Sequence, residues 1–390
     1  DGLDEVTVRA DRGLVARRVG EFLDAYPASR AVITSRFVGY HEAPLPEELP
    51  HFLLAPFDRE EIQDFAGKWC LASEVQSGDT EPARRRARRE AEKLMGAIEA
   101  RPRIYNLATN PLLLTVIALI QRQGVTLPDH RVELYAQMTR TLIETWTRAR
   151  TLVGGRPVGE PLREGEALSV LAPLALWMHE HYPGSAAPAA AIREQIVASL
   201  VAAGEAPARA GADADEFLDL VRHQTGLLVE RGQGVFGFMH LTFEEYLAAR
   251  GLVLLGQIDL GRTWQALQPR LYDPAWHEVI LLTVGHYAIS EGKREAACYL
   301  IEAMLDDTPP PEHAGENAVL AGRCLRDIGA PDGRRDATRQ RVEEALLATM
   351  QDPARPARTR ANAGEVLDAL GWLPPDLNEW LEVPAPGGGE

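Results

Sequence analysis

The chain has 390 residues, a length that corresponds to two or three domains of ordinary size. Apolar residues make up 45% of it and charged residues 25%, as in a typical globular protein, which excludes a disordered or low-complexity chain. The formal net charge is −16, so the overall field of the chain repels nucleic acid and anionic membranes. We therefore expect neither a membrane nor a nucleic acid as a partner.

The sequence predicts no membrane-spanning helix, because its longest apolar run, Leu112–Ile120, is interrupted by Thr115 and is far shorter than the roughly 18 residues required. The three cysteines show no CxxC spacing and are odd in number, which favours neither a zinc site nor a disulfide framework. A cytoplasmic location is expected. The sequence begins at Asp1 with no initiator methionine and no signal segment, and we expect it to be part of a longer polypeptide.

The first 57 residues carry mixed helix and strand signals. Val15–Leu23 has the spacing of an amphipathic helix, Ala31–Arg36 has the composition of a strand, and His51–Phe57 is a further apolar run. This mixture is typical of the end of an α/β unit. From Arg59 onward the apolar spacing of three and four predicts mainly helices. The first of these helices is expected to bury Ile62, Phe65, Ala66 and Trp69.

Helices joined by loops are predicted for most of the middle of the chain. Clusters of Gly, Pro and Ala indicate loops at 154–161, 183–188 and 204–211. The segments Gly226–Arg231 and Val235–Met239 predict a β-hairpin, and a helix is expected to start directly after it at Thr242. The hairpin turn also satisfies the G-x-G-x-x-G pattern, but a second strand follows it where a dinucleotide site requires a helix.

Two further stretches have an unusual composition. Arg84–Arg103 carries eight basic groups against three acidic ones, so it could contact a phosphate or an acidic partner, although a solvated helix stabilised by neighbouring ion pairs gives the same pattern.

From about Trp264 to Leu373 the chain is predicted to form paired helices. Gly322 and Gly364 recur there in similar Ala-Gly-x-x-Leu contexts, and such small residues let helices approach closely, as in stacked helical repeats.

Three carboxylates lie within the first five residues, at Asp1, Asp4 and Glu5. Oxygen ligands of this kind suit Mg²⁺ together with phosphate oxygens, and a further carboxylate can orient an attacking water. An acidic surface loop would have the same composition. Arg36 ends the predicted strand, at the position where α/β folds present ligand-binding groups, although an ordinary strand end explains it as well.

Five segments, in this order, resemble motifs of the NACHT-type ATPases within the STAND class of signal-transduction NTPases. Asp1–Glu5 is similar to the family's Walker B motif, and Val32–Tyr40 is similar to its sensor strand. Phe52–Trp69 resembles the last core strand and the helix after it. Asn106–Leu114 is similar to the proline-containing motif of the helical domain, and Phe238–Ala249 to the histidine-containing motif of the winged-helix domain. The resemblance covers about residues 1–250.

The resemblance implies a role for six residues and names the cofactors as ATP or ADP with Mg²⁺. Asp1 would associate with Mg²⁺, whereas Asp4 and Glu5 would be the catalytic residues that position the attacking water. Arg36 would contact the γ-phosphate, and Pro111 would pack against the adenine. His240 would reach the β-phosphate of ADP in the closed state.

One departure from the family pattern changes the expected activity. The chain contains no G-x-x-x-x-G-K-[ST] sequence, the motif whose backbone and lysine hold the phosphates. In the family this motif precedes Walker B, so we expect the chain to begin inside the ATPase domain. Alone it should bind nucleotide weakly and hydrolyse nothing, and ATPase activity is expected only in a full-length protein.

Two histidine groupings could suggest a metal site. His179-Glu-His181 lacks the H-E-x-x-H spacing of zinc ligands and is expected to be the polar end of a helix. His240 and Glu244 would share a helix face, with Glu245 beside them. For His240 a structural role, the family's phosphate contact and metal ligation all remain open on the sequence alone.

Together these features predict a mainly α chain with a partial α/β element. The expected parts are the end of a truncated P-loop ATPase core at 1–57, a helical domain at 58–125, a winged-helix domain at 126–250, HEAT-like helical repeats at 251–375 and a linker at 376–390.

The resemblance implies a bacterial signal-transduction switch, which ADP keeps closed and ATP opens for self-association. An unidentified protein or ligand would trigger it, in a setting such as defence against phage. Two alternatives belong to other classes: a nucleotide-independent helical scaffold that binds a protein partner through residues 251–390, and a winged-helix transcription regulator, which the net charge opposes.

Overall fold

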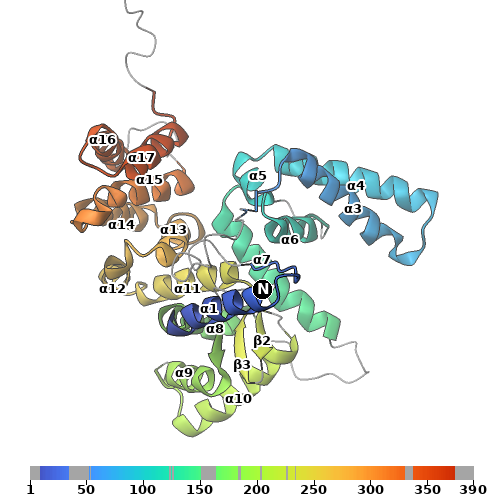
Figure 1. The fold of residues 1–390 in the computed structure, drawn as a ribbon. Coiled ribbons are helices and arrows are strands. Elements are labelled where there is room, and N and C mark those ends of the chain that lie inside the picture. Colours follow the sequence, from blue (N-terminus) through green and yellow to red (C-terminus); the bar gives the residue numbers. More distant parts are fainter. Residues whose placement is uncertain are drawn as a thin grey trace, which may run out of the picture.

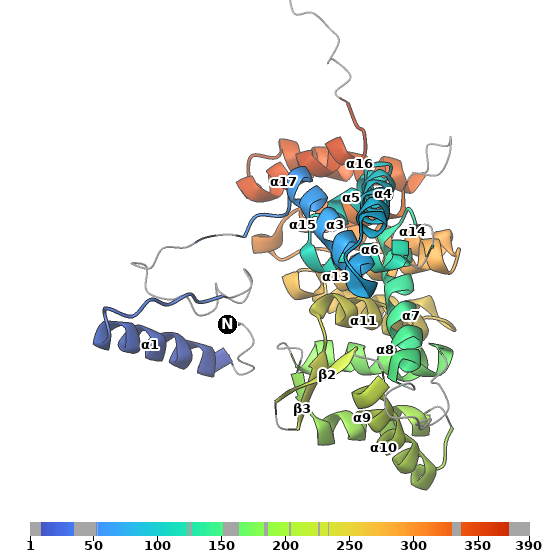
Figure 2. The same cartoon turned by 90° about the vertical axis from the view of Figure 1, so that its right-hand side faces the viewer.

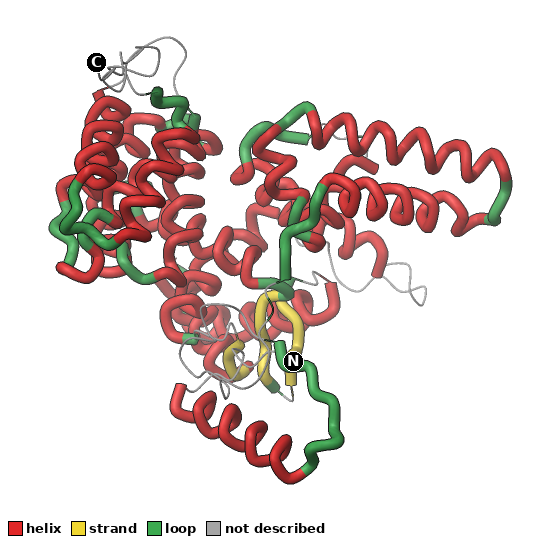
Figure 3. Tube along the Cα trace, turned by 45° about the horizontal axis from the view of Figure 1, so that its top comes forward, coloured by secondary structure: helices red, strands yellow, loops and turns green. Residues whose placement is uncertain are grey.

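The computed structural model shows a predominantly helical protein. Within the part of the chain that it describes, the only strands form one small sheet (Figure 3). The described residues are 9–34, 52, 54–122, 124, 127–150, 164–182, 186–202, 204–224, 227–232, 234–329 and 337–373.

The first helix, α1 (Arg9–Ala25), packs in a small cluster of its own. In this cluster Ala16 is buried against Val15, Val19 and Ile33. Figure 2 shows α1 lying apart from the other helices. The amphipathic helix predicted for this segment is therefore present, with a small hydrophobic contact area.

The strands predicted at 31–36 and 51–57 are not formed by those of their residues that the structure describes. Residues 31–34 and 54–57 are irregular, and Val32, Phe52 and Leu54 are 89%, 90% and 98% exposed. A buried strand requires neighbouring strands that complete its backbone hydrogen bonds. The three strands of the described chain pair only with one another, so these two segments have no sheet to join.

Helices α3 (Arg59–Glu74) and α4 (Glu81–Glu99) form a hairpin that projects from one side of the molecule (Figure 1). Helices α5 (Pro102–Ala108) and α6 (Pro111–Arg122) pack at its base. A capping box starts α3: the Asp58 side chain accepts from the Glu61 N–H at 2.8 Å, and the Glu61 carboxylate accepts from the Asp58 N–H at 3.0 Å.

The basic stretch predicted at Arg84–Arg103 lies mainly on α4, where intramolecular ion pairs neutralise part of its charge. Arg84 makes two hydrogen bonds to Asp79 at 2.6 and 2.7 Å, and Lys93 lies 2.7 Å from a carboxylate oxygen of Glu90. These contacts agree with the second interpretation of this stretch, a solvent-exposed helix stabilised by neighbouring ion pairs.

The middle of the chain has the topology of a winged helix. Two antiparallel pairings form a sheet with the order β1-β3-β2, and α9 and α10 lie between β1 and β2 in the sequence. Helix α11 follows the sheet directly. The elements are α7 (Arg131–Arg150), α8 (Glu164–His181), β1 (Ala186–Pro188), α9 (Ala189–Ala202), α10 (Pro207–Gln224), β2 (Leu228–Gly232), β3 (Val235–Phe238) and α11 (Leu241–Leu255).

The structure confirms the predicted hairpin, whose strands β2 and β3 meet at Gly234, a turn residue with a φ of +72° that favours glycine. Two of the predicted loops are partly wrong. Residues 186–188 form β1, which pairs with β3, and residues 207–211 belong to α10. Pro207 is tolerated there because the first residue of a helix needs no N–H partner within the helix.

The remaining described chain confirms the predicted series of paired helices. Gly322 permits a close contact between three of them: a Cβ at this position would lie 2.6 Å from Val366 Cγ1 and 2.9 Å from Leu346 Cδ1. Gly364 is in ordinary contact, because its Cβ would lie 3.4 Å from the Met350 sulfur. The helices are α12 (Leu260–Leu267), α13 (His277–Gly285), a π-helical turn (His286–Ser290), α14 (Arg294–Asp306), α15 (Glu316–Ile328), α16 (Ala337–Gln351) and α17 (Ala357–Ala369).

One hydrophobic core runs through α3–α17, from Ile62 to Leu367. Within this core, buried polar groups connect the winged helix to the C-terminal helices. At the start of α7, Arg131 lies 2.7 Å from Glu278 of α13 and 2.5 Å from Asp327 of α15. Burial opposes the charged guanidinium, but these two carboxylates outweigh it and hold the pKa of Arg131 above its ordinary value.

A second buried polar contact joins α8, α11 and the residues before α13. His179 Nε2 lies 3.1 Å from the carbonyl oxygen of Ala275, a contact that requires a protonated Nε2. His179 Nδ1 lies 3.0 Å from Glu244 Oε1, so the same imidazole also contacts this carboxylate. The segment His179–His181 is the end of a helix, as predicted, with Glu180 and His181 exposed, but His179 itself is buried at 9% exposure, as is Glu244 at 1%.

A third contact closes the end of α11. The Thr263 hydroxyl donates to the carbonyl oxygen of Leu252 at 3.0 Å and lies 2.9 Å from the Tyr287 hydroxyl. The neighbouring His286 is also buried; this burial, with the nearby Arg250 cation, lowers the pKa of its imidazole to about 4, so the ring is neutral near pH 7. These three contacts join the winged helix to the C-terminal helices.

Helices α8 and α11 pack more closely than ordinary side chains would allow. A Cβ on Gly251 would lie 2.7 Å from the backbone carbonyl oxygen of Ala172 and 3.0 Å from Leu176 Cβ. A backbone atom cannot move away as a long side chain can, so only glycine fits here.

The described part of the chain contains no helix with the length and hydropathy needed to span a lipid bilayer.

We predict that Gly251→Ala lowers the free energy of unfolding by about 2 kcal/mol, because the added methyl group separates α8 from α11. Gly96→Ala in α4 is the matched control: no atom lies within 4 Å of its Cβ position, so it should stabilise the protein by about 0.5–1 kcal/mol through helix propensity alone. Urea unfolding followed by circular dichroism measures both. Equal effects of the two variants would contradict the close helix contact.

Candidate functional site

Two of the six predicted site residues can be placed in the structure. Pro111 and His240 each stand at the N-terminal end of a helix, α6 and α11. The other four, Asp1, Asp4, Glu5 and Arg36, lie outside the described residues. The candidate site residues that can be placed therefore lie at two helix starts.

Pro111 is the first residue of α6 and is exposed. Its position is fixed by Asn110, whose side-chain oxygen accepts hydrogen bonds from the N–H groups of Leu112 at 2.9 Å and Leu113 at 3.3 Å. Pro111 needs no such partner, because it has no N–H. The turn thus presents a rigid, apolar ring at the surface, which is what packing against a flat ligand requires.

The start of α3 is fastened to the same turn. The Phe57 N–H donates to the carbonyl oxygen of Thr109 at 2.8 Å, which places residues 57–58 beside the turn before Pro111. Neighbouring residues of α3 line an open groove of about 640 Å³. Two sequence segments that resembled family motifs, around Phe57 and around Asn110, are therefore adjacent in the structure.

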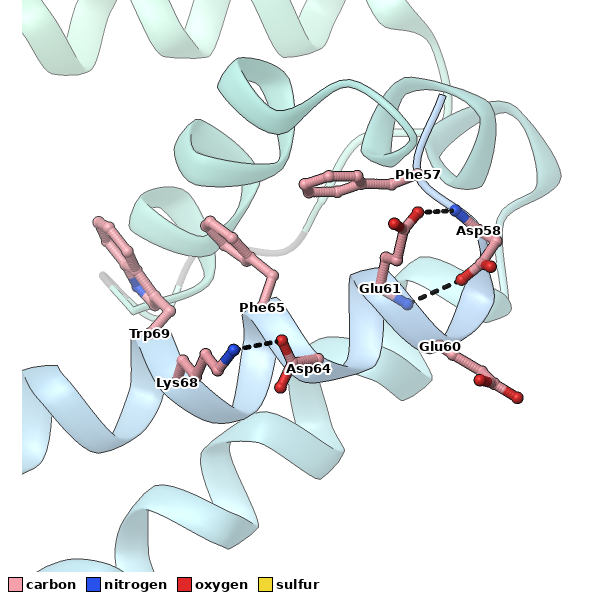
Figure 4. Close-up of a pocket in the computed structure, with 8 residues that line it drawn as sticks. All are labelled: Phe57, Asp58, Glu60, Glu61, Asp64, Phe65, Lys68 and Trp69. Carbon is pink, nitrogen blue, oxygen red and sulfur yellow. Dashed lines mark hydrogen bonds and ion pairs between the residues drawn. The ribbon is translucent and has the colours of Figure 1, made fainter. Parts of the chain in front are cut away.

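The groove combines aromatic and acidic side chains (Figure 4). Phe65 and Trp69 stack with 5.9 Å between ring centroids, and Lys68 pairs with Asp64 at 2.7 Å. The sequence predicted that these two aromatic residues are buried together with Ile62; the structure buries Ile62 fully and Phe65 and Trp69 only partly, along the groove. Its lining residues are Phe57, Asp58, Glu60, Glu61, Asp64, Phe65, Lys68 and Trp69.

His240 is the N-cap residue of α11. Its backbone is extended, with φ −149° and ψ 147°, and its Nδ1 accepts a hydrogen bond from the Thr242 N–H at 3.2 Å. A histidine that caps a helix in this way must have an unprotonated Nδ1, and in the neutral ring the proton is then on Nε2. The half-buried ring therefore carries one N–H donor, which suits an anionic oxygen.

The metal site considered for this segment is not supported. Glu244 does not face His240 but bonds to the buried His179, and its second oxygen, Oε2, is buried without a hydrogen-bond partner among the described residues. The described residues contain no group of three or more His, Cys, Asp or Glu side chains that could hold a metal ion. Sequence spacing could not reveal the pairing of Glu244, because its partner lies 65 positions away.

Comparison with known proteins identifies the middle of the chain. Residues 131–252 match a family model described as the winged helix-turn-helix domain C-terminal to NACHT, and this range begins with α7 and ends within α11. No curated protein matches the chain. The match supports a NACHT-associated protein, in agreement with the β1-β3-β2 sheet and the helices around it.

The capping role of His240 predicts a difference between two substitutions. His240→Ala removes the acceptor for the Thr242 N–H and should lower the free energy of unfolding by about 1 kcal/mol. His240→Asn supplies a side-chain oxygen that can cap the helix, so its stability should stay within about 0.5 kcal/mol of the original. Chemical unfolding of the 390-residue chain measures both. Equal losses would show that His240 does not stabilise α11 through this bond.

Proposed function

We propose that this chain is the regulatory part of a NACHT/STAND-type signal-transduction ATPase, in which ADP holds a closed state through His240 and ATP favours an open, self-associating state. One observation supports this most strongly: in a segment that matches a winged-helix domain C-terminal to NACHT, a histidine is held so that a single ring N–H can donate.

The geometry of His240 suits a contact with a phosphate. A hydrogen bond from a neutral donor to a charged acceptor contributes about 1.5–3 kcal/mol. If it forms in only one of two states, it shifts the equilibrium between them by roughly tenfold to a hundredfold. A nucleotide that binds both states equally would shift nothing, so His240 would set how strongly ADP favours the closed form.

The other roles in this proposal come from the family resemblance. Pro111, exposed on a rigid turn, would pack against the adenine. Arg36 would contact the γ-phosphate, Asp1 would associate with Mg²⁺, and Asp4 with Glu5 would position water. A cytoplasmic protein of this type would respond to an unidentified ligand or protein, as in defence against phage.

A DNA-binding role is less well supported. Helix α10 occupies the place of the helix that reads DNA in DNA-binding helix-turn-helix proteins, yet Asp215 and Glu216 are on its exposed face. Two of the nearby cations are already paired: Arg193 makes a two-pronged contact with Asp215, and Arg209 lies 3.3 Å from Asp213. Such a surface repels phosphates instead of releasing their counterions.

Calorimetry with ADP and Mg²⁺ tests the proposal on the full natural polypeptide and on the 390-residue chain. We expect the natural polypeptide to bind ADP and His240→Asn to weaken binding about tenfold or more, although the helix cap is retained. The 390-residue chain should bind more weakly, because it has no Walker A sequence.

His181→Asn is the matched control, since His181 is exposed at the end of α8. It should leave ADP affinity unchanged. No ADP binding by the natural polypeptide would contradict the switch and favour a nucleotide-independent helical scaffold. Equal affinities of the original and His240→Asn proteins would contradict the role of His240.

A further inference from the structure

The hairpin of α3 and α4 exposes surfaces of opposite charge. Four carboxylates and one lysine line the groove along α3, whereas the exposed residues of α4 include several arginines. Between the two helices the opposite charges are already paired: Arg86 lies 2.8 Å from Glu74, and Arg59 lies 2.8 Å from Glu99. The question is which charges of the hairpin remain without a partner.

On α4 the charges without a partner are arginines. Arg88 and Arg89 are exposed, and neither forms an ion pair with another described residue. Arg85 lies 3.8 Å from Glu81, which is beyond hydrogen-bond distance. The spacing of three and four places these three arginines on one face of the helix, called here the α4 arginine face. Glu92, one turn after Arg88, reduces the positive charge of this face but is outnumbered.

On α3 the carboxylate without a partner is Glu60, which is exposed and forms no ion pair with a described residue (Figure 4). The same groove presents the stacked rings of Phe65 and Trp69, with 5.9 Å between centroids and 13° between planes. A planar guanidinium can lie on an aromatic ring and donate to a carboxylate at the same time, and its apolar stem can cover further ring surface. The groove therefore suits arginine side chains.

The net charge of −16 makes a second copy of the chain an acidic partner for α4. Two such copies repel each other through their overall fields, so a favourable contact requires that surfaces of opposite charge meet. The α4 arginine face and the α3 groove are such surfaces. Both lie on a hairpin that projects from the molecule, where a second copy can approach them (Figure 1).

We propose that the α3 groove of one copy receives the α4 arginine face of a second copy, with Arg88 and Arg89 beside Glu60 and the rings of Phe65 and Trp69. Every copy carries both surfaces, so the contact can be repeated from copy to copy. As the surface used for self-association in the ATP-bound state, the contact rests on the proposed function. The contact itself requires no nucleotide.

Sedimentation velocity of the 390-residue chain tests the contact without nucleotide. The sedimentation coefficient of the original chain should rise with concentration. Glu60→Arg, and separately the double substitution Arg88→Glu with Arg89→Glu, replace attraction by repulsion and should each weaken self-association about tenfold or more. Circular dichroism and the melting temperature show whether the variants are folded.

Glu365→Arg on α17 is the matched control for Glu60→Arg, because it makes the same change of charge at another exposed carboxylate. It should leave self-association unchanged. Equal weakening by both substitutions would overturn the proposal, because net charge and not the groove would then determine association. An original chain that stays monomeric up to its solubility limit would also overturn it.

A mixture of the two charge-reversed proteins is the sharpest test. The groove of the Glu60→Arg protein is positive at the contact, and the α4 face of the doubly substituted protein is negative, so opposite charges meet again. We expect the mixture to associate although neither protein does so alone. A mixture that stays monomeric would overturn the proposed pairing of the two surfaces.

The natural polypeptide with ATP and Mg²⁺ separates failure of this inference from failure of the proposed function. If the unsubstituted polypeptide binds no nucleotide, the proposed function fails, whereas the mixture of 390-residue variants still decides whether the contact exists. If ATP drives self-association and Glu60→Arg leaves it unchanged, the proposed function stands and the role of this contact in the switch is overturned.

Discussion

The ion-paired cluster around Arg131 is the constraint that determines how the winged helix and the C-terminal helices fit together. One cation from the start of α7 pairs with both Glu278 of α13 and Asp327 of α15, whose side chain is 12% exposed. Removing the cation would leave two carboxylates at a largely buried contact between three helices, which costs far more than an exposed ion pair contributes. The arrangement is stable only when all three helices meet.

The consequence for a switch is that these helices move together. The contact of His179 with the Ala275 carbonyl oxygen and the hydrogen bond from Thr263 to the Leu252 carbonyl oxygen cross the same boundary, and Gly251 holds α11 against α8 within the winged helix. A rotation of the winged helix, and with it His240, would therefore carry α12–α17 along as a rigid lever. Under the proposed function, a ligand bound at the start of α11 would thereby move a distant surface, because a rigid junction transmits the rotation.

Local patterns in the sequence predicted local structure well and long-range pairing poorly. The hairpin and the start of α11 followed from turn glycines and alternation, and the close contact at Gly322 followed from small-residue spacing. Strand β1 was missed because three residues are too few to show an alternating pattern. The strands predicted near Val32 and Phe52 are not formed, because a strand depends on pairing with neighbouring strands, which a local pattern does not reveal. His240 was proposed as a site residue from its motif. The pairs Arg131–Glu278 and His179–Glu244 had no signal in the sequence, since their members are 147 and 65 positions apart.

Hydrogen exchange followed by mass spectrometry tests most directly whether these helices form one body. In the original protein, amides of α11, α13 and α15 should open with one common free energy, and Arg131→Met should lower it by roughly 3 kcal/mol in all three. Arg341→Met, which removes an exposed ion pair with Asp306, should lower it by less than about 1 kcal/mol. Opening of α13 and α15 at a lower free energy than α11, or an effect of Arg131→Met confined to one side of the junction, would contradict the account.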